Sequence, residues 1–443
     1  VWENLNENAM PLLEGVILMN DYTLLVSRSS KLDYARDHLN ELFGKKYPRN
    51  FRREHVSYRR DTPEELAVIN YTSGTTSYSK GVMIPYRALW SNTQFAFDVL
   101  KMNPGDKLVS MLPMAHMYGL AFEFLYEFCV GCHIYFLTRT PSPKIIFQAF
   151  SEVKPNLVVA VPLIIEKIIK KNVLPKLETP AMKILLKVPI INDKIKATVR
   201  EQMINAFGGN FYEIIVGGAA FNQEIEQFLK SIDFPYTVGY GMTECAPIIC
   251  YEDWKYFKLG SCGKAAPRME VKILSPDPEN IVGEIVCKGP NVMLGYLNDP
   301  EETKKVLEKD KDNVVWLHTG DMGKMDEDGF IYFDGRLKRI IISSGYNLYP
   351  NHIESVIIKH PMVEEVCVIG VDHPYKSQVA KAFVVLKSGA REDTVRREIK
   401  KLCLEYLAKY SQPYQIEFRS SLPRTNLGKI DYKQLEREEK EKK

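Results

Sequence analysis

The chain has 443 residues, of which 45% are hydrophobic, 26% charged and 11% aromatic, and its formal net charge is +3. This composition is typical of a folded globular protein and excludes a disordered chain, a collagen-like chain and a disulfide-stapled miniprotein. At about 150 residues per domain, the length accommodates about three domains, or one large and one small domain.

Charge and hydropathy argue against two broad classes of function. The balanced charge and the lack of a repeating aromatic platform argue against nucleic-acid binding. The longest apolar run, residues 157–165, is well short of the ~20 residues that cross a bilayer, so we expect no transmembrane segment.

The eight cysteines are scattered and no secretory signal accompanies them. We therefore expect reduced thiols and a cytoplasmic location.

From residue 66 to about residue 335, β-rich runs alternate with longer helical patterns. Strands are expected over residues 66–71, 107–112, 133–137, 157–160, 213–216, 236–239 and 283–288. Helices are expected over residues 86–100, 143–153, 193–207 and 222–231. This alternation predicts an α/β fold of βαβ units, in which helices cover a mostly parallel sheet. From residue 271 the turns come closer together, which predicts a small antiparallel barrel.

A second pattern begins after residue 335. It predicts strands over residues 340–343, 365–371 and 380–386, helices over 352–359 and 392–407, and then a basic tail. We therefore expect a large N-terminal domain of residues 1–335 and a small α+β C-terminal domain of residues 336–443.

The first chemical motif directly follows the apolar run 66–69. It is Tyr71-Thr72-Ser73-Gly74-Thr75-Thr76-Ser77-Tyr78-Ser79-Lys80-Gly81. Hydroxyl and backbone N–H groups can surround phosphate oxygens and a lysine adds a point charge, so the loop suits a polyphosphate. It is not a P-loop, because Gly81 rather than serine or threonine follows the lysine. The alternative is a polar surface loop.

The second motif also follows a predicted strand. It is Val238-Gly239-Tyr240-Gly241-Met242-Thr243-Glu244, and a related segment, Gly217-Gly218-Ala219-Ala220, closes another strand. Glycines on both sides of an aromatic residue allow the backbone to approach a flat ring closely. Glu244 offers a hard oxygen ligand for Mg²⁺. The alternative for each glycine pair is a tight turn.

Two further motifs lie towards the C-terminus. In the third, His318-Thr319-Gly320-Asp321 is followed by Asp334-Gly335-Arg336-Leu337-Lys338, where a carboxylate and an arginine in nearby turns could hold a ribose diol and a phosphate. The fourth, residues 423–431, sets Lys429 on a glycine-containing loop before a polar terminal helix. The alternatives are solvated loop charges and an ordinary basic tail.

Two other patterns suggest metal or haem chemistry. Cys129-Val130-Gly131-Cys132-His133 has the spacing of a haem-attachment site. It lies in the apolar segment 122–137 and no second Cys-x-x-Cys exists, so we expect neither haem nor zinc there. The acidic run Asp326-Glu327-Asp328-Gly329 is expected to be a hairpin turn rather than a pair of catalytic carboxylates.

Taken together, the four motifs in this order and spacing resemble the acyl-adenylate-forming superfamily, which contains acyl-CoA synthetases, luciferases and the adenylation domains of peptide synthetases. The resemblance covers residues 66 to 432. It implies a large N-terminal and a small, mobile C-terminal domain, with the active site between them. It also implies that a carboxylate attacks the α-phosphate of Mg²⁺-bound ATP, and that a thiol, usually coenzyme A, then displaces AMP. Such chemistry depends on positioning and charge neutralisation.

The resemblance implies roles for residues at matching positions in the large domain. The residues implied to hold the β- and γ-phosphates are Thr72, Ser73, Gly74, Thr75, Thr76 and Lys80. Those implied to surround the adenine and the acyl group are Gly217, Gly218, Ala219, Tyr240, which would stack on the base, and Gly241. Thr243 would contact the α-phosphate, Glu244 would bind Mg²⁺, and His116 would act as a gate beside the acyl site.

Other implied roles concern the ribose, the adenylation step and the transfer to coenzyme A. Asp321 would bind the ribose hydroxyls, helped by Arg336. Lys429 would bridge the carboxylate and the α-phosphate during adenylation. Lys338 would be the hinge whose rotation removes Lys429, and Gly345 would let the pantetheine arm of coenzyme A pass.

The preferred interpretation is a fatty-acid–CoA ligase. Cys245 and Ala246 are small, Met114, Met117 and Leu120 are apolar around His116, and no acidic residue is placed to recognise an amino acid's ammonium group. Peripheral membrane contact is compatible with a lipid substrate. The sequence does not indicate an oligomeric state.

Three alternatives remain open: a ligase for an aryl or short-chain acid, an oxygenase of luciferase type, and a non-catalytic nucleotide or acyl binder. Ser77 and Ser79 replace a glycine and a proline of the family, which favours the binder. Retention of Lys429 favours an enzyme. Members of the family also carry a further N-terminal stretch ahead of the position of Val1, so we expect this chain to be part of a longer protein.

Overall fold

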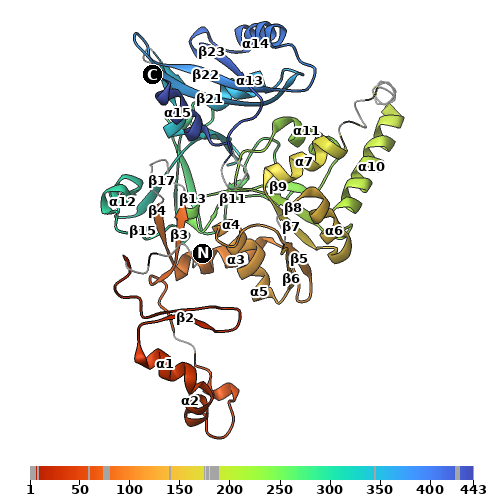
Figure 1. The fold of residues 1–443 in the computed structure, drawn as a ribbon. Helices are drawn as coiled ribbons and strands as arrows, with labels where there is room; N and C mark the ends of the chain where they lie inside the picture. Colours follow the sequence, from red (N-terminus) through yellow and green to blue (C-terminus); the bar gives the residue numbers. More distant parts are fainter. Residues whose placement is uncertain are drawn as a thin grey trace. The chain divides into compact units, whose positions relative to one another are not determined.

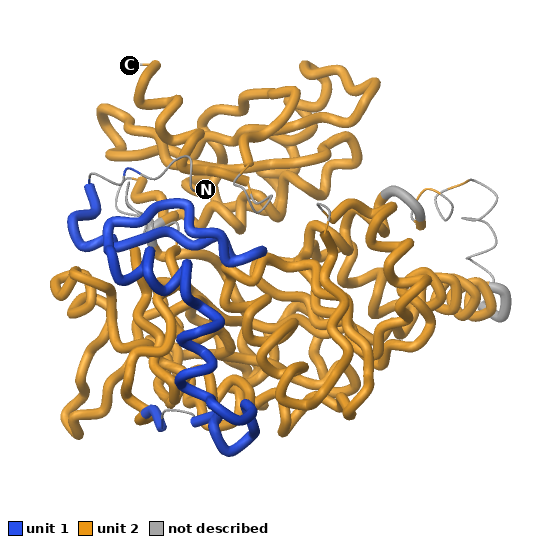
Figure 2. Tube along the Cα trace, turned by 60° about the horizontal axis from the view of Figure 1, so that its bottom comes forward, with its two compact units in different colours: residues 1–61 blue, residues 62–443 orange. Residues whose placement is uncertain are grey.

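The computed structural model of the protein describes residues 6, 9–57, 60–72, 80–138, 141–173, 175, 179, 189–343, 346–424 and 430–442 (Figure 1). The chain divides into two compact units, residues 1–61 and residues 62–443, which Figure 2 shows in blue and orange. The expected boundary between residues 335 and 336 lies within the second unit and stays a prediction.

The first unit consists of short elements. They are β1 (Gly15–Ile17) and β2 (Leu24–Ser27), which pair in antiparallel orientation, the helices α1 (Ser30–Asp37) and α2 (Leu39–Lys46), and the 3₁₀ turn η3 (Arg53–His55). Neither helix contains a fully buried residue. Aromatic contacts hold the end of the unit together, because the ring of Tyr47 lies 4.9 Å from the rings of both Phe43 and Phe51.

Two parallel sheets form the centre of the second unit. β5 (Lys107–Ser110) pairs with β6 (His133–Phe136), and β8 (Glu213–Val216) lies between β7 (Leu157–Ala160) and β9 (Tyr236–Val238). The connecting helices include α6 (Pro143–Val153), α7 (Pro162–Asn172), α10 (Pro189–Ala206) and α11 (Gln223–Ser231). Every residue of β7 and β8 is buried, as expected for strands covered on both faces. The predicted α/β class is confirmed.

The first predicted strand of this series is not part of a parallel sheet. β3 (Leu66–Thr72) pairs in antiparallel orientation with β4 (Lys80–Pro85), a strand that the sequence analysis did not predict. The physical reason is the short connection, since residues 73–79 are fewer than the dozen or more needed for a parallel crossover. Thr72 and Lys80 are therefore cross-strand partners. Helix α3 (Tyr86–Val99) follows, and β15 (Gly295–Tyr296) pairs with the other edge of β4.

Residues 270–336 form the predicted antiparallel section. Its strands are β13 (Glu270–Leu274), β14 (Gly283–Lys288), β16 (Leu307–Lys309), β17 (Val315–Met325) and β18 (Ile331–Arg336). Helix α12 (Pro300–Val306) interrupts the section and was not predicted, although its start carries a clear signal. The Oδ1 atom of the N-cap residue Asp299 accepts a hydrogen bond from the backbone N–H of Glu302 at 3.0 Å, and Pro300 is the first helical residue.

The C-terminal elements include a five-stranded sheet with both parallel and antiparallel pairs, drawn in blue in Figure 1. Its strands are β19 (Ile341–Ser343), β20 (Tyr346–Leu348), β21 (Val363–His373), β22 (Ser377–Leu386) and β23 (Gln415–Arg419). Its helices are α13 (Pro350–Ile357), α14 (Glu392–Tyr406) and α15 (Tyr432–Glu441). Helix α15 is anchored by the fully buried Leu435 and by the salt bridge of Glu439 with Lys381 at 2.7 Å.

All eight cysteines are free thiols. Within the described part of the chain, no helix is long and apolar enough to cross a membrane.

Phe207 is central to the core around the parallel sheet. It is fully buried and its ring contacts those of Phe150, Phe211 and Phe234. Phe207→Ala should lower the free energy of unfolding by about 3–5 kcal/mol through the lost transfer energy and the cavity left behind. Phe128→Ala, at a position 70% exposed, is the matched control and should change it by less than about 0.5 kcal/mol. Urea denaturation followed by circular dichroism measures both, and equal effects would contradict the assigned core.

Candidate functional site

Two glycine segments lie at one edge of the β7-β8-β9 sheet. Gly217 follows the last residue of β8, and Gly239 follows the last residue of β9. Their backbone N–H groups continue the pairing, because Gly217 donates to the carbonyl of Ala160 at 3.0 Å and Gly239 donates to the carbonyl of Val216 at 2.9 Å. The strands are parallel, so both segments lie at their carboxyl ends, where open α/β sheets bind ligands.

Close packing explains two of these glycines. A Cβ atom on Gly217 would lie 3.1 Å from the ring of Tyr118, and one on Gly241 would lie 2.2 Å from the carbonyl oxygen of Pro247. The hydroxyl of Tyr118 donates to the carbonyl of Ile215 at 3.1 Å, which holds its ring beside the glycine segment. Tyr118, which directly follows Met117, was not predicted from the sequence as a site residue.

A buried carboxylate connects the second glycine motif to the antiparallel section. Asp321 of β17 is 4% exposed and accepts a hydrogen bond from the hydroxyl of Tyr240 at 2.8 Å. Its Oδ1 atom lies 3.2 Å from Nε of Arg336. The sequence analysis placed Asp321 and Arg336 in nearby turns, and this was wrong. They are cross-strand partners of β17 and β18, because the hairpin between these strands sets their register.

Burial dominates the electrostatics of Asp321. It raises the pKa of the carboxyl above its ordinary value, although the charge of Arg336 and the hydrogen bond from Tyr240 act in the opposite direction. Burial, and then the charge of Asp321, also raise the pKa of Tyr240, so its hydroxyl stays protonated and remains a donor.

A second cluster lies around Glu244, in the 3₁₀ turn η5 (Thr243–Cys245). Glu244 is 8% exposed and its Oε1 atom accepts a hydrogen bond from the hydroxyl of Tyr296 at 2.8 Å. The ammonium group of Lys80 lies 4.7 Å from the centroid of the Tyr296 ring and donates a hydrogen bond to Glu302 of α12. The sequence analysis missed both Tyr296 and Glu302. The helix-start signal Asp299-Pro300 would have placed Glu302 in the first turn of a helix.

The segment around His116 contacts β3, the strand that ends at Thr72. His116 is the N-cap residue of the short helix α4 (Met117–Leu120). The side-chain amide of Asn70, in β3, donates to the carbonyl of Ala115 at 2.7 Å. The structure thereby brings His116 and the end of β3 into one region.

Some predicted residues lie outside the described part of the chain. They are Ser73, Gly74, Thr75, Thr76, Ser77, Ser79, Gly345 and Lys429. Their roles stay predictions. Of the remaining predicted residues, Gly218 and Ala219 follow Gly217, and Thr243 is the first residue of η5.

The two patterns that suggest metal or haem chemistry have structural roles. Gly131, with φ of 89°, ends helix α5 (Tyr126–Val130), which contains Cys129, and His133 begins β6. The acidic run is the predicted hairpin turn, where Lys258 contacts Asp326 and Asp328 at 2.7 and 2.6 Å. No cluster of three or more His, Cys, Asp or Glu side chains suited to a metal occurs among the residues that the structure describes.

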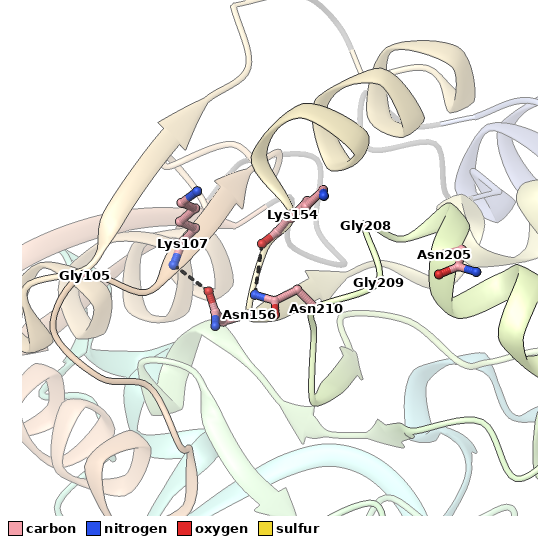
Figure 3. A pocket seen from close by; sticks show the side chains of 8 residues that line it. All are labelled: Gly105, Lys107, Lys154, Asn156, Asn205, Gly208, Gly209 and Asn210. Atoms are coloured by element: carbon pink, nitrogen blue, oxygen red, sulfur yellow. Dashed lines mark hydrogen bonds between the residues drawn. The ribbon is translucent and has the colours of Figure 1, made fainter.

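A surface pocket of about 500 Å³ lies at the opposite edge of the parallel strands (Figure 3). Its lining includes Lys107, the first residue of β5, and Asn156, which precedes β7; the backbone N–H of Lys107 donates to Oδ1 of Asn156 at 2.9 Å. These are amino ends of strands, whereas the glycine segments lie at carboxyl ends. The pocket is therefore separate from the candidate site.

Comparison with known proteins identifies the family. The model of AMP-binding enzymes matches residues 21–297, and that of the AMP-binding enzyme C-terminal domain matches residues 352–429. A long-chain-fatty-acid–CoA ligase of Bacillus subtilis is 33% identical over 392 residues, which cover 86% of this chain and 63% of that protein. A 2-succinylbenzoate–CoA ligase of Geobacillus kaustophilus is 32% identical over 379 residues, which cover 84% of this chain and 69% of that protein.

The structural comparison agrees. The ATP-bound structure of MatB from Rhodopseudomonas palustris superposes with a TM-score of 0.71 at 27% identity, covering 86% of this chain and 70% of that chain. The fold is that of the acyl-adenylate-forming superfamily. The protein belongs to the AMP-binding enzyme family. It spans less than two thirds of the length of the long-chain-fatty-acid–CoA ligases that it matches.

His318 should make the stability of the site region depend on pH. Its Nδ1 atom lies 2.9 Å from Glu284, which also accepts the backbone N–H of Gly320, and its Nε2 atom lies 2.9 Å from Glu308. Burial opposes the charged imidazolium, but the hydrogen bond and charge of Glu284, and then those of Glu308, outweigh it, so the pKa of His318 is raised. A raised pKa in the folded state stabilises the fold below the unfolded pKa of about 6.5.

This stabilisation is lost as the pH rises through the folded pKa. The difference in melting temperature between the wild type and His318→Gln should therefore be largest near pH 6 and shrink towards about pH 9. Thermal melts across this range measure it. A difference that is constant or grows with pH would contradict the assigned salt bridges.

Proposed function

We propose that the protein activates a fatty acid with Mg²⁺-bound ATP to an acyl-adenylate, with release of pyrophosphate, and then transfers the acyl group to the thiol of coenzyme A, with release of AMP. The observation that carries the proposal is the convergence of the Tyr240 hydroxyl and the Arg336 guanidinium on the buried carboxylate of Asp321. An aromatic ring just after a parallel strand, with a carboxylate and a cation on two antiparallel strands beside it, suits a purine, a ribose diol and a phosphate.

The nucleotide would extend from this group towards Lys80. In the proposal Tyr240 stacks on the adenine between Gly239 and Gly241, and Asp321 accepts hydrogen bonds from the ribose hydroxyls. Lys80, with residues Thr72–Thr76, receives the β- and γ-phosphates. The carboxylate of Glu244 is a hard oxygen donor held by one tyrosine hydroxyl, which fits a Mg²⁺ ion that keeps water and phosphate oxygens as its other ligands. Mg²⁺ would neutralise charge on the phosphates.

The C-terminal residues are proposed to act in both halves of the reaction. We propose that residues 336–443 form a mobile lid that carries Lys429 to the α-phosphate for adenylation, with Lys338 as the hinge. Thr243 would contact the α-phosphate, His116 would gate the acyl site, and Gly345 would let the pantetheine arm of coenzyme A pass. Neutralising the negative charge on the oxygens of the pentacoordinate α-phosphorus is the main requirement of the first step, and a lysine fulfils it.

The choice of a fatty acid depends on apolar neighbours. Met117, Cys245 and Ala246 are buried within one hydrophobic cluster, and Tyr118, Leu120 and Tyr240 pack against it. An alkyl chain needs only such apolar surface. The long-chain-fatty-acid–CoA ligase of Bacillus subtilis supports this substrate, whereas the 2-succinylbenzoate–CoA ligase of Geobacillus kaustophilus supports an aryl acid as the alternative.

The test is carboxylate-dependent ATP–pyrophosphate exchange with acids from acetate to oleate and with benzoate. Exchange should occur with fatty acids and fall by at least about 100-fold in Lys429→Ala, because one positioned charge contributes several kcal/mol to the transition state. Lys440→Ala, at an exposed lysine of α15, is the matched control and should retain full exchange.

Each other outcome changes the proposal. Exchange with benzoate alone would assign an aryl substrate. ATP binding that is lost in Asp321→Asn, without exchange for any acid, would leave a nucleotide-binding protein. Absence of ATP binding by the wild type would overturn the proposed function.

A further inference from the structure

Lys80 already has a partner within the protein. Its ammonium group donates a hydrogen bond to Oε1 of Glu302, which lies 222 residues later in the chain. The two side chains are largely buried, with exposures of 11% and 13%. The face of the Tyr296 ring covers the same ammonium group at 4.7 Å. The pair is therefore shielded from the solvent and salt that weaken surface salt bridges.

Glu302 is held in place by the start of helix α12. Its backbone N–H is capped by Oδ1 of Asp299 at 3.0 Å. The neighbouring Thr303 hydroxyl accepts the backbone N–H of Tyr296 at 2.9 Å and donates to the carbonyl of Asp299 at 2.8 Å. The helix is thus tied to β15, which pairs with the strand that begins at Lys80. These contacts fix the backbone of Glu302 beside the strand that begins at Lys80.

Glu302 remains charged under all physiological conditions. The hydrogen bond from Lys80, with the further contact to Lys305, lowers its pKa to about 2 against the opposing effect of burial. Lys305 lies 3.1 Å away and is 69% exposed, so it is a weaker, solvent-screened partner. The negative charge is directed mainly at Lys80.

The same contacts connect Lys80 with Glu244. The ring of Tyr296 covers Lys80, and its hydroxyl donates to Glu244 at 2.8 Å. The residues proposed for the nucleoside, Asp321 and Tyr240, lie on other strands, β17 and β10 (Tyr240–Gly241). Because Glu302 pairs with Lys80, which the proposed function assigns to the β- and γ-phosphates, it is placed to affect the polyphosphate end of a nucleotide.

We propose that Glu302 is a specificity-determining residue, which competes with the β- and γ-phosphates of the nucleotide for Lys80. This inference rests on the proposed function, in which Lys80 contacts these phosphates. A phosphate that approaches Lys80 must replace Glu302 as its partner, so the lost ion pair offsets part of the new interaction. Glu302 thereby weakens binding of ATP and pyrophosphate and favours pyrophosphate release. It leaves AMP unaffected, because AMP lacks both phosphates.

Glu302→Gln tests the competition, because it keeps the shape of the side chain and removes its charge. Calorimetric titration with ATP, pyrophosphate and AMP should show Kd values for ATP and pyrophosphate that are lower by about tenfold, as expected for the loss of one charge-assisted hydrogen bond to a competitor. The Kd for AMP should be unchanged. Glu301→Gln is the matched control: Glu301 lies on the same helix, is 77% exposed and pairs with Lys304. It should leave all three Kd values unchanged.

A double-mutant cycle identifies Lys80 as the site of the competition. In Lys80→Gln, the further change Glu302→Gln should no longer alter the Kd for ATP. The inference is overturned if Glu302→Gln binds ATP as the wild type does or more weakly, while AMP binding is retained. It is also overturned if Glu302→Gln changes the Kd values for ATP and AMP equally, or if it still lowers the Kd for ATP in the Lys80→Gln background. Failure of the wild type to bind either ATP or AMP would instead overturn the proposed function.

Discussion

The buried carboxylate of Asp321 is the constraint on which the candidate site depends. A charged group with 4% exposure is stable only when hydrogen bonds and an opposite charge replace its hydration. Tyr240 provides the hydrogen bond from β10, which belongs to another antiparallel sheet, and Arg336 provides the charge from β18, the strand paired with that of Asp321. Because the two partners come from different sheets, satisfying Asp321 fixes these sheets with respect to each other at the place where a nucleotide would bind.

The sequence predicted best those elements whose signals are local. The apolar runs of β7 and β8 and the helix α6, which begins with the cap Ser142 and Pro143, follow from residues within each segment. Strand β4 was missed because its six residues lie between a polar loop and a helix, and only pairing with β3 and β15 defines it. Helix α12 was missed although its cap signal is present in the sequence.

Most partners of the site residues could not be predicted, because they depend on long-range packing. Nothing in the sequence relates Lys80 to Glu302, or Glu244 to Tyr296, which are 222 and 52 residues apart. The pair Asp321 and Arg336 is a partial exception. A single hairpin connects their strands, and its turn was predicted from the sequence; the β-bulge between Met322 and Gly323, which shifts the register by one residue to place Asp321 opposite Arg336, was not. The motifs indicated which residues belong together, and the fold determined which of them neutralise one another.

The charged groups proposed for ligand binding already have partners within the protein. Asp321 faces Arg336, Lys80 faces Glu302, and the carboxylate of Glu244 accepts the Tyr296 hydroxyl. Binding of a nucleotide at such a site is an exchange of partners, and its affinity is the difference between two sets of interactions of similar kind. Residues that never contact the ligand, such as Glu302, can then set the affinity as strongly as those that do. The balance of charge among these side chains would therefore be part of the specificity of the site.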